Sequence, residues 1–340
     1  MDIAQMREPV LDAPIDTMLH EQLLDRRARL RDAQSQRALD LEVSRLLGEV
    51  DAALERFGKG TFGLCEECHD PIEPERLVAD PLIKLCLGDL TQKQLDDMQR
   101  DLQLAAEIQK GLLPKGDLST GPWEVDLAYH PAGIVSGDYV DVMHVGDEIY
   151  FILGDVSGKG MAASILMSNL HAMFHVLIPI GLELCDLMER ANRLFAESTL
   201  ANQYATLVVG KMNKQGEVEM CNAGHLPPIV VGGDKSVELD STGLPLGMFS
   251  DSSFVSSGVK LAPGETLLLF TDGVTEANDA AGSEFGTDRL RTSINGSANG
   301  HPTDLLQTCV NAVAAFRNGT PRNDDMTMLA LRYTGKVMGD

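Results

Sequence analysis

Apolar residues recur along the first third of the chain with the spacing of an α-helix. From about Asp16 to Phe57 the pattern is helical, which predicts one long helix or a short helical hairpin. The residues that recur three or four positions apart, with charges between them, are Val43, Leu46, Leu47, Val50, Leu54 and Phe57. A Gly-Lys-Gly turn at 58–60 ends this pattern. A compact segment that contains cysteines follows over residues 61–90, and a further helix is expected over 91–113.

The helix expected over 91–113 carries one apolar stripe. A stripe of this kind either packs on the core of its own chain or forms the seam of a two-helix dimer, and the pattern leaves both alternatives open. A homodimer through residues 91–113 is therefore one hypothesis. The stripe consists of Leu95, Met98, Leu102, Ala105, Ile108 and Leu112.

After Gly121 the apolar pattern changes to the period of two that is typical of strands. Strands group with strands and helices with helices, which predicts an α+β fold with antiparallel sheets. Strands are expected at 123–130, 138–145, 148–155, 204–212, 216–221, 228–231, 265–270 and 326–333, and helices at 160–178, 182–200, 286–294 and 302–317.

These patterns divide the chain into four parts. Residues 1–15 are expected to form a flexible tail, and 16–90 a helical segment with the cysteine-bearing module. Residues 91–114 are expected to form a linker helix, and 115–335 the large α+β domain.

Charge and composition narrow the function classes. The 340 residues include 51 acidic and 28 basic side chains, for a formal net charge of −23, so direct binding of nucleic acid is not expected. The start of the chain lacks the features of a signal peptide. The most apolar window, 161–182, contains two histidines, an asparagine and a proline, which predicts a buried helix rather than a membrane span. A cytoplasmic protein without a membrane partner is expected.

Three of the six cysteines form a spaced cluster. Cys65 and Cys68 are separated by two residues, and Cys86 is followed at the same spacing by Asp89. Two such knuckles at this separation indicate a zinc site with Asp89 as the fourth ligand, or His69 in its place. The alternative is a site without zinc in which the thiols pack as small apolar groups.

The sequence around these cysteines resembles the DksA/TraR zinc-finger family. The resemblance covers about residues 40–90. In that family some members bind RNA polymerase through an acidic tip of a coiled coil, and no clear tip motif is present here. The quoted residues are Gly60-Thr61-Phe62-Gly63-Leu64-Cys65-Glu66-Glu67-Cys68, with Ile72, Arg76-Leu77, Ala79 and Pro81.

Four short motifs in the second half each place an aspartate at the edge of an expected strand. Any one of them alone would usually be a turn. Several carboxylates at one spot repel one another unless cations lie between them, and Mg²⁺ or Mn²⁺ are the natural occupants. The motifs are Ser136-Gly137-Asp138-Tyr139-Val140-Asp141, Gly154-Asp155-Val156-Ser157-Gly158-Lys159-Gly160, Phe270-Thr271-Asp272-Gly273-Val274-Thr275-Glu276 and Asn323-Asp324-Asp325-Met326-Thr327.

As a set, in this order, the motifs resemble the metal-dependent PPM serine/threonine phosphatases, and more closely their bacterial SpoIIE/RsbU branch. The resemblance runs from about residue 105 to 334 and implies two stacked antiparallel sheets flanked by helices, with a binuclear metal centre at one end. Further supporting stretches are Ala106-Glu107-Ile108-Gln109-Lys110-Gly111-Leu112-Leu113-Pro114, Cys221-Asn222-Ala223-Gly224-His225-Leu226-Pro227-Pro228, Thr242-Gly243-Leu244-Pro245-Leu246-Gly247 and Phe285-Gly286 with Arg289-Leu290.

The resemblance also assigns roles within that centre. Asp155 would bridge two Mg²⁺ or Mn²⁺ ions, and the backbone carbonyl of Val156 would help to hold one of them. The expected catalytic and metal-binding set is completed, directly or through water, by Asp138, Asp272 and Asp324.

Four further polar residues lie close to these motifs. Asp141 and Asp325 are predicted to support the ligands without binding metal themselves. Lys159 could contact phosphate, but a solvated lysine in a turn is the favoured interpretation. His225 could act as a general acid, but a hydrogen-bonded structural histidine is the favoured interpretation.

The resemblance implies hydrolysis of phosphoserine or phosphothreonine by a water that two metal ions activate. The substrate would be a regulatory phosphoprotein, for which a STAS-type anti-sigma-factor antagonist is the candidate by analogy. The N-terminal module would regulate the enzyme through the linker helix. The alternative hypothesis is a non-catalytic adaptor that binds a transcription partner such as RNA polymerase through its finger.

Overall fold

The computed structural model describes residues 13–36, 41–89, 92–115, 118–199, 203–232, 235–241, 243–295 and 300–335. The chain forms two compact units, Met1–Asp101 and Leu102–Asp340. Most of the tail expected at residues 1–15 lies outside the described residues.

The first unit contains a helical hairpin, which is the second of the two alternatives that the sequence allowed. Helices α1 (Ala13–Gln36) and α2 (Leu41–Gly58) pack against each other, and α3 (Pro74–Ala79) and the 3-10 turn η1 (Leu87–Asp89) follow. Helix α4 (Gln92–Leu112) begins in this unit and continues into the second. The core of the first unit consists of Leu19, Leu23, Val50, Ala53, Phe62, Cys65, Ile72, Leu77 and Cys86.

The second unit contains two five-stranded sheets whose paired strands are all antiparallel. The first sheet has the order β1-β10-β9-β6-β7 and the second β2-β3-β4-β5-β8. The strands are β1 (Trp123–His130), β2 (Tyr139–Val145), β3 (Glu148–Val156), β4 (Ala205–Met212), β5 (Glu217–Ala223), β6 (Ile229–Gly232), β7 (Lys235–Glu238), β8 (Ser257–Lys260), β9 (Thr266–Phe270) and β10 (Met326–Tyr333).

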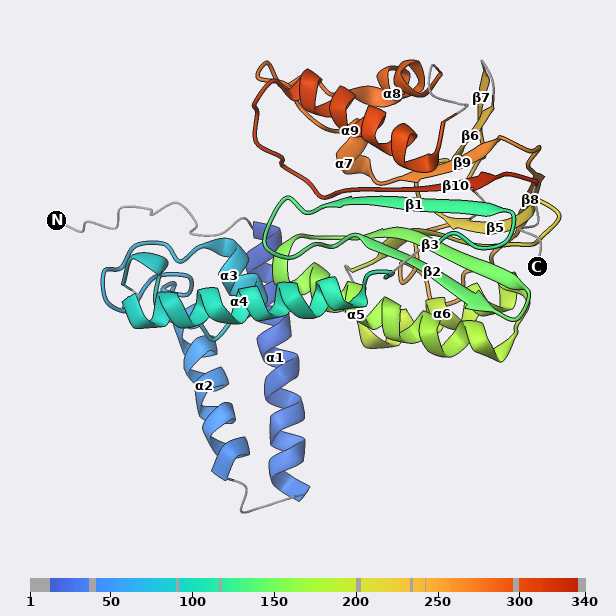
Figure 1. The fold of residues 1–340 in the computed structure, drawn as a ribbon. Coiled ribbons are helices and arrows are strands. Elements are labelled where there is room, and N and C mark those ends of the chain that lie inside the picture. Colours follow the sequence, from blue (N-terminus) through green and yellow to red (C-terminus); the bar gives the residue numbers. More distant parts are fainter. Residues whose placement is uncertain are drawn as a thin grey trace. The chain divides into compact units, whose positions relative to one another are not determined.

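Helices cover the outer faces of both sheets (Figure 1). Helices α5 (Gly160–Leu177) and α6 (Leu184–Ser198), with the short turn η2 (Ile178–Ile180) between them, pack on the sheet that contains β2 and β3. Helices α7 (Asp272–Thr275), α8 (Gly286–Ile294) and α9 (Pro302–Arg317) lie on the other sheet. The α+β fold of two antiparallel sheets flanked by helices is therefore confirmed.

Strand β3 illustrates why this layering follows from the sequence. Phe151 and Leu153 lie in the core between the two sheets, whereas Tyr150 and Ile152 lie in the core under α5 and α6. A strand that is covered on both faces has no polar side, and its sequence is accordingly an almost continuous apolar run.

The apolar window at 161–182 forms helix α5 and the turn after it. Gly160–Ile180 is long and apolar enough to cross a membrane by length and composition. However, Leu166, Leu170 and Phe174 belong to the core beneath it. The helix is thus a core helix of the second unit, as the polar residues within the window had predicted.

Candidate active site

The four predicted aspartates come from the same end of the sandwich. Asp138 directly precedes β2, whose first residue pairs with Gly154, so Asp155 in β3 lies nearby. Asp272 begins α7 just after β9, and Asp324 lies just before β10, where Phe270 pairs with Met328. The register of both sheets therefore brings all four motifs to one edge.

The charges of these carboxylates act on their neighbours. Burial, and then the nearby charges of Asp272 and Asp324, raise the pKa of Asp155 to about 7. Burial and the charge of Asp324 likewise raise the pKa of Asp272 to about 6. Carboxylates that raise one another's pKa in this way favour a cation between them.

Asp138 is the most deeply buried member of the group, and its side chain is held from the opposite sheet. Its Oδ2 accepts hydrogen bonds from the hydroxyls of Thr271, at 2.9 Å, and Thr327. Burial and the charge of Asp155 raise its pKa well above the usual value. Sequence reasoning did not single out the two threonines, although both lie within the quoted motifs.

Gly137 leaves open space beside two of the predicted ligand atoms. A Cβ added to Gly137 would lie 3.2 Å from the carbonyl oxygen of Val156 and 3.4 Å from Oδ1 of Asp155, so both oxygens border the gap that this glycine leaves. Oxygen ligands of this kind are the ones that Mg²⁺ or Mn²⁺ prefer. Among the described residues, no three of the carboxylates bring oxygens within 4.8 Å of one another, so several ligands of such an ion would be water.

Lys159 differs from the prediction of a purely solvated lysine. Its side chain is largely exposed, but Nζ donates to Oδ2 of Asp324 at 2.9 Å and to the carbonyl of Asn323 at 2.7 Å. The hydrogen bond and the charge of Asp324 outweigh partial burial and raise the pKa of Lys159. Lys159 thus places a positive charge at the rim of the acidic group.

Asp325 holds the loop that leads to Asp138. Its two carboxylate oxygens accept from the backbone N–H of Ala132 at 2.7 Å and of Gly137 at 2.9 Å. The supporting role of Asp325 toward the metal ligands stays a prediction.

A residue of α4 holds the same loop from another side. The buried Gln109 side chain donates to the carbonyl of Ser136 at 2.7 Å and accepts from its N–H at 2.9 Å. The hydroxyl of Ser136 in turn accepts from the N–H of Asp138 at 3.0 Å. Gln109 is a polar residue on the buried side of an amphipathic helix. This feature could have indicated its role, but the sequence analysis did not predict it.

Asp141 does not support the acidic group, and that prediction is wrong. Because side chains alternate along β2, Asp141 lies on the face that α5 covers. Its Oδ2 contacts Nε2 of His175 at 2.7 Å, the hydroxyl of Tyr139 at 3.0 Å and Nδ1 of His171 at 3.3 Å.

His225 is a structural residue, as the turn motif suggested. Its ring is buried and contacts the hydroxyl of Thr206 at 2.9 Å and the carbonyl of Phe270 at 3.2 Å. Burial lowers its pKa to about 4, so the ring is neutral at pH 7. It braces the end of β9, directly before Thr271 and Asp272.

The cysteines of the first unit form a separate metal-type cluster. Sγ atoms of Cys65, Cys68 and Cys86 all lie within 4.8 Å of one another, and those of Cys68 and Cys86 are 3.5 Å apart. Thiolates on one zinc ion have comparable spacing. The His69 ring lies against the carbonyl of Cys65 at 3.2 Å, and the Asp89 side chain lies outside the described residues.

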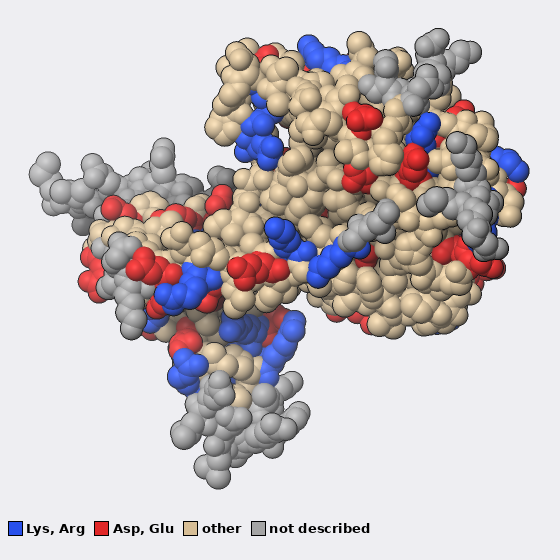
Figure 2. Space-filling view, viewed as in Figure 1, with Lys and Arg blue, Asp and Glu red and all other residues tan. Residues whose placement is uncertain are grey.

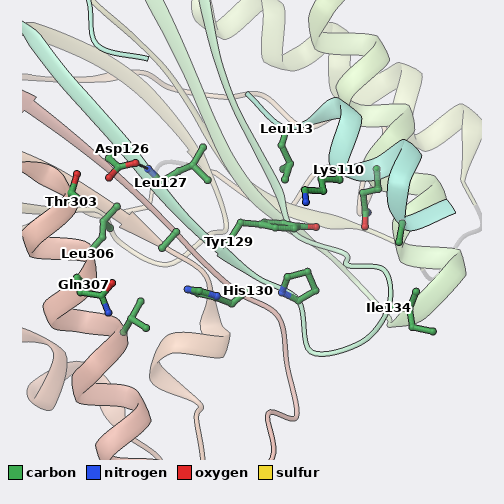
Figure 3. A pocket seen from close by; sticks show the side chains of 15 residues that line it. Lys110, Leu113, Asp126, Leu127, Tyr129, His130, Ile134, Thr303, Leu306 and Gln307 are labelled. Carbon is green, nitrogen blue, oxygen red and sulfur yellow. Dashed lines mark hydrogen bonds between the residues drawn. The ribbon is translucent and has the colours of Figure 1, made fainter. Parts of the chain in front are cut away.

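A cavity of about 650 Å³ lies between α4, β1 and α9 (Figure 3). Lys110, Tyr129, His130 and Leu306 are among the residues that line it, and none of the four predicted metal aspartates does. Burial raises the pKa of Tyr129 to about 12 and lowers that of His130. This cavity therefore does not coincide with the candidate catalytic centre.

Charged side chains of both signs lie on the face of the molecule that Figure 2 shows. Acidic side chains are interspersed with basic ones there.

Comparison with known proteins identifies two matching families. Residues 146–334 match the family model of stage II sporulation protein E (SpoIIE), and residues 60–88 match the prokaryotic DksA/TraR C4-type zinc finger.

Among curated proteins, the chain is 30% identical over 186 residues to the phosphoserine phosphatase RsbP of Bacillus subtilis, covering 52% of this chain and 46% of RsbP. The chain spans about half the length of the first curated relatives that it matches.

Two solved structures share the fold. The SiaA-PP2C domain of Pseudomonas aeruginosa superimposes with a TM-score of 0.62 at 19% identity, covering 70% of this chain and 98% of that one. The RsbU and RsbW domains of Rv1364c from Mycobacterium tuberculosis give a TM-score of 0.57 at 26% identity, covering 66% and 62%.

Proposed function

Because the chain belongs to the SpoIIE family of PPM-type phosphatases and also carries a DksA/TraR-type zinc finger, we propose that it is a metal-dependent protein serine/threonine phosphatase. Its substrate would be a phosphoserine or phosphothreonine on a regulatory protein. The observation that carries this proposal is the acidic group of Asp138, Asp155, Asp272 and Asp324 at one end of the sandwich.

The residues of the acidic group would together bind two Mg²⁺ or Mn²⁺ ions. Asp155 would bridge them, the carbonyl of Val156 would bind one, and the remaining aspartates would bind directly or through water. When bound, two such ions would supply an activated water for attack on phosphorus and would offset the charge of the phosphoryl oxygens. Thr271 and Thr327 fix the Asp138 carboxylate in one orientation.

The contacts of Lys159 support a role in lowering the negative charge at the entrance to the acidic group. It neutralises part of the charge of Asp324 at the exposed rim, where a phosphorylated residue would approach. A cation at that rim would reduce repulsion between the acidic group and the anionic substrate.

The direct test is manganese-dependent hydrolysis of p-nitrophenyl phosphate and of a phosphoserine protein by the full chain. We expect hydrolysis that EDTA abolishes and that Asp155→Asn reduces by at least about 100-fold, since this variant removes the bridging charge. Glu276→Gln, on an exposed residue near the group, is the matched control and should retain activity. Hydrolysis by Asp155→Asn at the wild-type rate would refute the assignment.

The regulatory part of the proposal concerns α4. Leu104 and Ile108 are large apolar residues that are exposed on this helix, at 56% and 59%, and lie one turn apart. Such a pair suits a helix–helix seam, which supports a homodimer through residues 91–113. Gln109 on the same helix holds the loop before Asp138, so a change in α4 would reach the acidic group.

We infer that the N-terminal module, with zinc held by Cys65, Cys68 and Cys86, controls this helix. The test compares the full chain with a chain that lacks residues 1–90, in activity and in oligomeric state. We expect both properties to change, and an unchanged pair of measurements would count against regulation while leaving the phosphatase assignment intact.

A STAS-type phosphoprotein in a partner-switching pathway is the substrate class that we propose. The similarity to the phosphoserine phosphatase RsbP supports a phosphoserine protein as the substrate, and the STAS type is chosen by analogy. Dephosphorylation of a purified STAS phosphoprotein, compared with an unrelated phosphoserine protein, would test this choice.

A further inference from the structure

A second polar cluster lies in the catalytic unit and takes no part in the proposed reaction. It consists of Asp141 on β2 and of His171 and His175 on α5, whose ligand atoms all lie within 4.8 Å of one another. We propose that these three side chains bind a borderline divalent transition-metal ion, for which zinc is the probe.

The first argument is the arrangement of the two histidines. They are four residues apart on one helix and therefore share a face, and their ring centroids are 4.0 Å apart. Two histidines at this spacing on a helix, with a carboxylate from another element, form a familiar type of zinc site.

The second argument is that hydrogen bonding does not satisfy the cluster. Three groups converge on Oδ2 of Asp141, with His175 Nε2 at 2.7 Å, the Tyr139 hydroxyl at 3.0 Å and His171 Nδ1 at 3.3 Å. Nδ1 of His171 is buried and faces this carboxylate without the geometry of a hydrogen bond. A cation would take a lone pair from this nitrogen as well as from the other two ligand atoms.

The distances are compatible with a metal after a small adjustment. Zinc–ligand bonds of about 2.0–2.1 Å in a tetrahedron place ligand atoms about 3.3–3.4 Å apart. The separation between His171 and Asp141 already has this value, and that between His175 and Asp141 has to open by about 0.6 Å. His175 is 42% exposed, so its ring has room to move and water can complete the coordination.

The surroundings favour ligation as well. The N–H of Val142 donates to Oδ1 of Asp141 at 2.8 Å, and Tyr139 donates to Oδ2, so the carboxylate is oriented by partners outside the cluster.

A metal at this position would fasten α5 to β2. Asp138 directly precedes β2, and Lys159 directly precedes α5. The proposed site therefore joins two elements whose starting points carry groups of the acidic centre, but it is chemically distinct from that centre because it offers nitrogen ligands.

The test measures zinc bound per chain by elemental analysis and by competition with a chromophoric chelator. Excess Mg²⁺ is present throughout so that the acidic centre is occupied. The wild type is compared with His171→Gln/His175→Gln, and His144→Gln serves as the control because His144 is an exposed histidine of the same strand. Zinc at the cysteine cluster contributes equally to all three proteins and cancels.

We expect the wild type and His144→Gln to bind one zinc ion more than the double variant, and zinc to raise their Tm further. If the double variant fails to fold in EDTA by circular dichroism, His175→Gln alone is used, with an expected loss of at least about 10-fold in zinc affinity. Equal zinc content and equal affinity in the variants and the wild type would overturn the proposal.

Discussion

Replacing Gln109 by leucine should weaken the metal centre without touching any of its ligands. Leucine is similar in size and keeps the buried position filled, but it can neither donate to the carbonyl of Ser136 nor accept from its N–H. Both backbone groups of Ser136 then lose their partner in a buried place. The loop that carries Asp138 must either tolerate this loss or move.

The magnitude follows from the two contacts. A buried polar group without a partner costs about 1–3 kcal/mol, so two such groups at Ser136 amount to about 2–6 kcal/mol. Each 1.4 kcal/mol corresponds to a factor of about ten in an equilibrium constant. If the loop relaxes by moving Asp138 away from its position, metal affinity should fall by at least about tenfold.

The assay is a Mn²⁺ titration of p-nitrophenyl phosphate hydrolysis by the full chain. Gln109→Leu should need at least about tenfold more Mn²⁺ for half-maximal rate, with a smaller effect at saturation. Gln103→Leu is the matched control, since Gln103 is exposed on the same helix. If both variants have the wild-type midpoint, α4 does not hold the centre and the proposed route of regulation is wrong.

Three further outcomes are expected. In EDTA at pH 7.5, Asp155→Asn should melt at a higher temperature than the wild type, because a buried charge with acidic neighbours is removed; a lower Tm would contradict this. The pKa values of Asp155 and Asp272 are raised to about 7 and about 6, so the folded metal-free chain binds more protons than the unfolded chain. The stability that these bound protons contribute is present at about pH 4 and is lost as the pH rises to about 7. The difference in Tm between Asp155→Asn and the wild type should therefore narrow at pH 5. Cys68→Ser should lower the zinc content and the Tm of the first unit, as followed by circular dichroism and calorimetry, while its exposed position limits any packing loss; an unchanged zinc content would exclude Cys68 as a ligand.

The sequence predicted most of the strands because their apolar runs are long and their faces are covered. It did not predict β7 and β8, which have four residues each and lie at sheet edges. In β8 the burial only alternates between half-buried and exposed, so the apolar signal is weak. Helix α7 was also missed, since its four residues directly follow a strand and include a glycine.

The candidate site was predictable only to the level of its motifs. Asp138, Asp155, Asp272 and Asp324 stand out because each interrupts a pattern at a strand end. Their hydroxyl and amide partners are ordinary polar residues, and nothing in their spacing shows which backbone or carboxylate they reach.

The prediction for Asp141 was wrong for a related reason. Closeness in sequence to Asp138 suggested closeness in space, but the pleat of β2 directs the side chain toward α5. Its meeting with His171 and His175 depends on how a helix packs on a sheet, which local pattern does not contain.

The threonine contacts of Asp138 bear on which aspartates would persist in relatives that have lost catalysis. The Asp138 carboxylate belongs to one sheet and is gripped by hydroxyls at the edge of the other, so it joins the two layers as well as serving the proposed chemistry. A lineage that abandoned catalysis would be free to change Asp155, whose burial is less complete and whose repulsion destabilises the fold. Such a lineage would retain Asp138 for longer. An aspartate at this position in a relative is therefore weak evidence of phosphatase activity, and an aspartate at the position of Asp155 is better evidence.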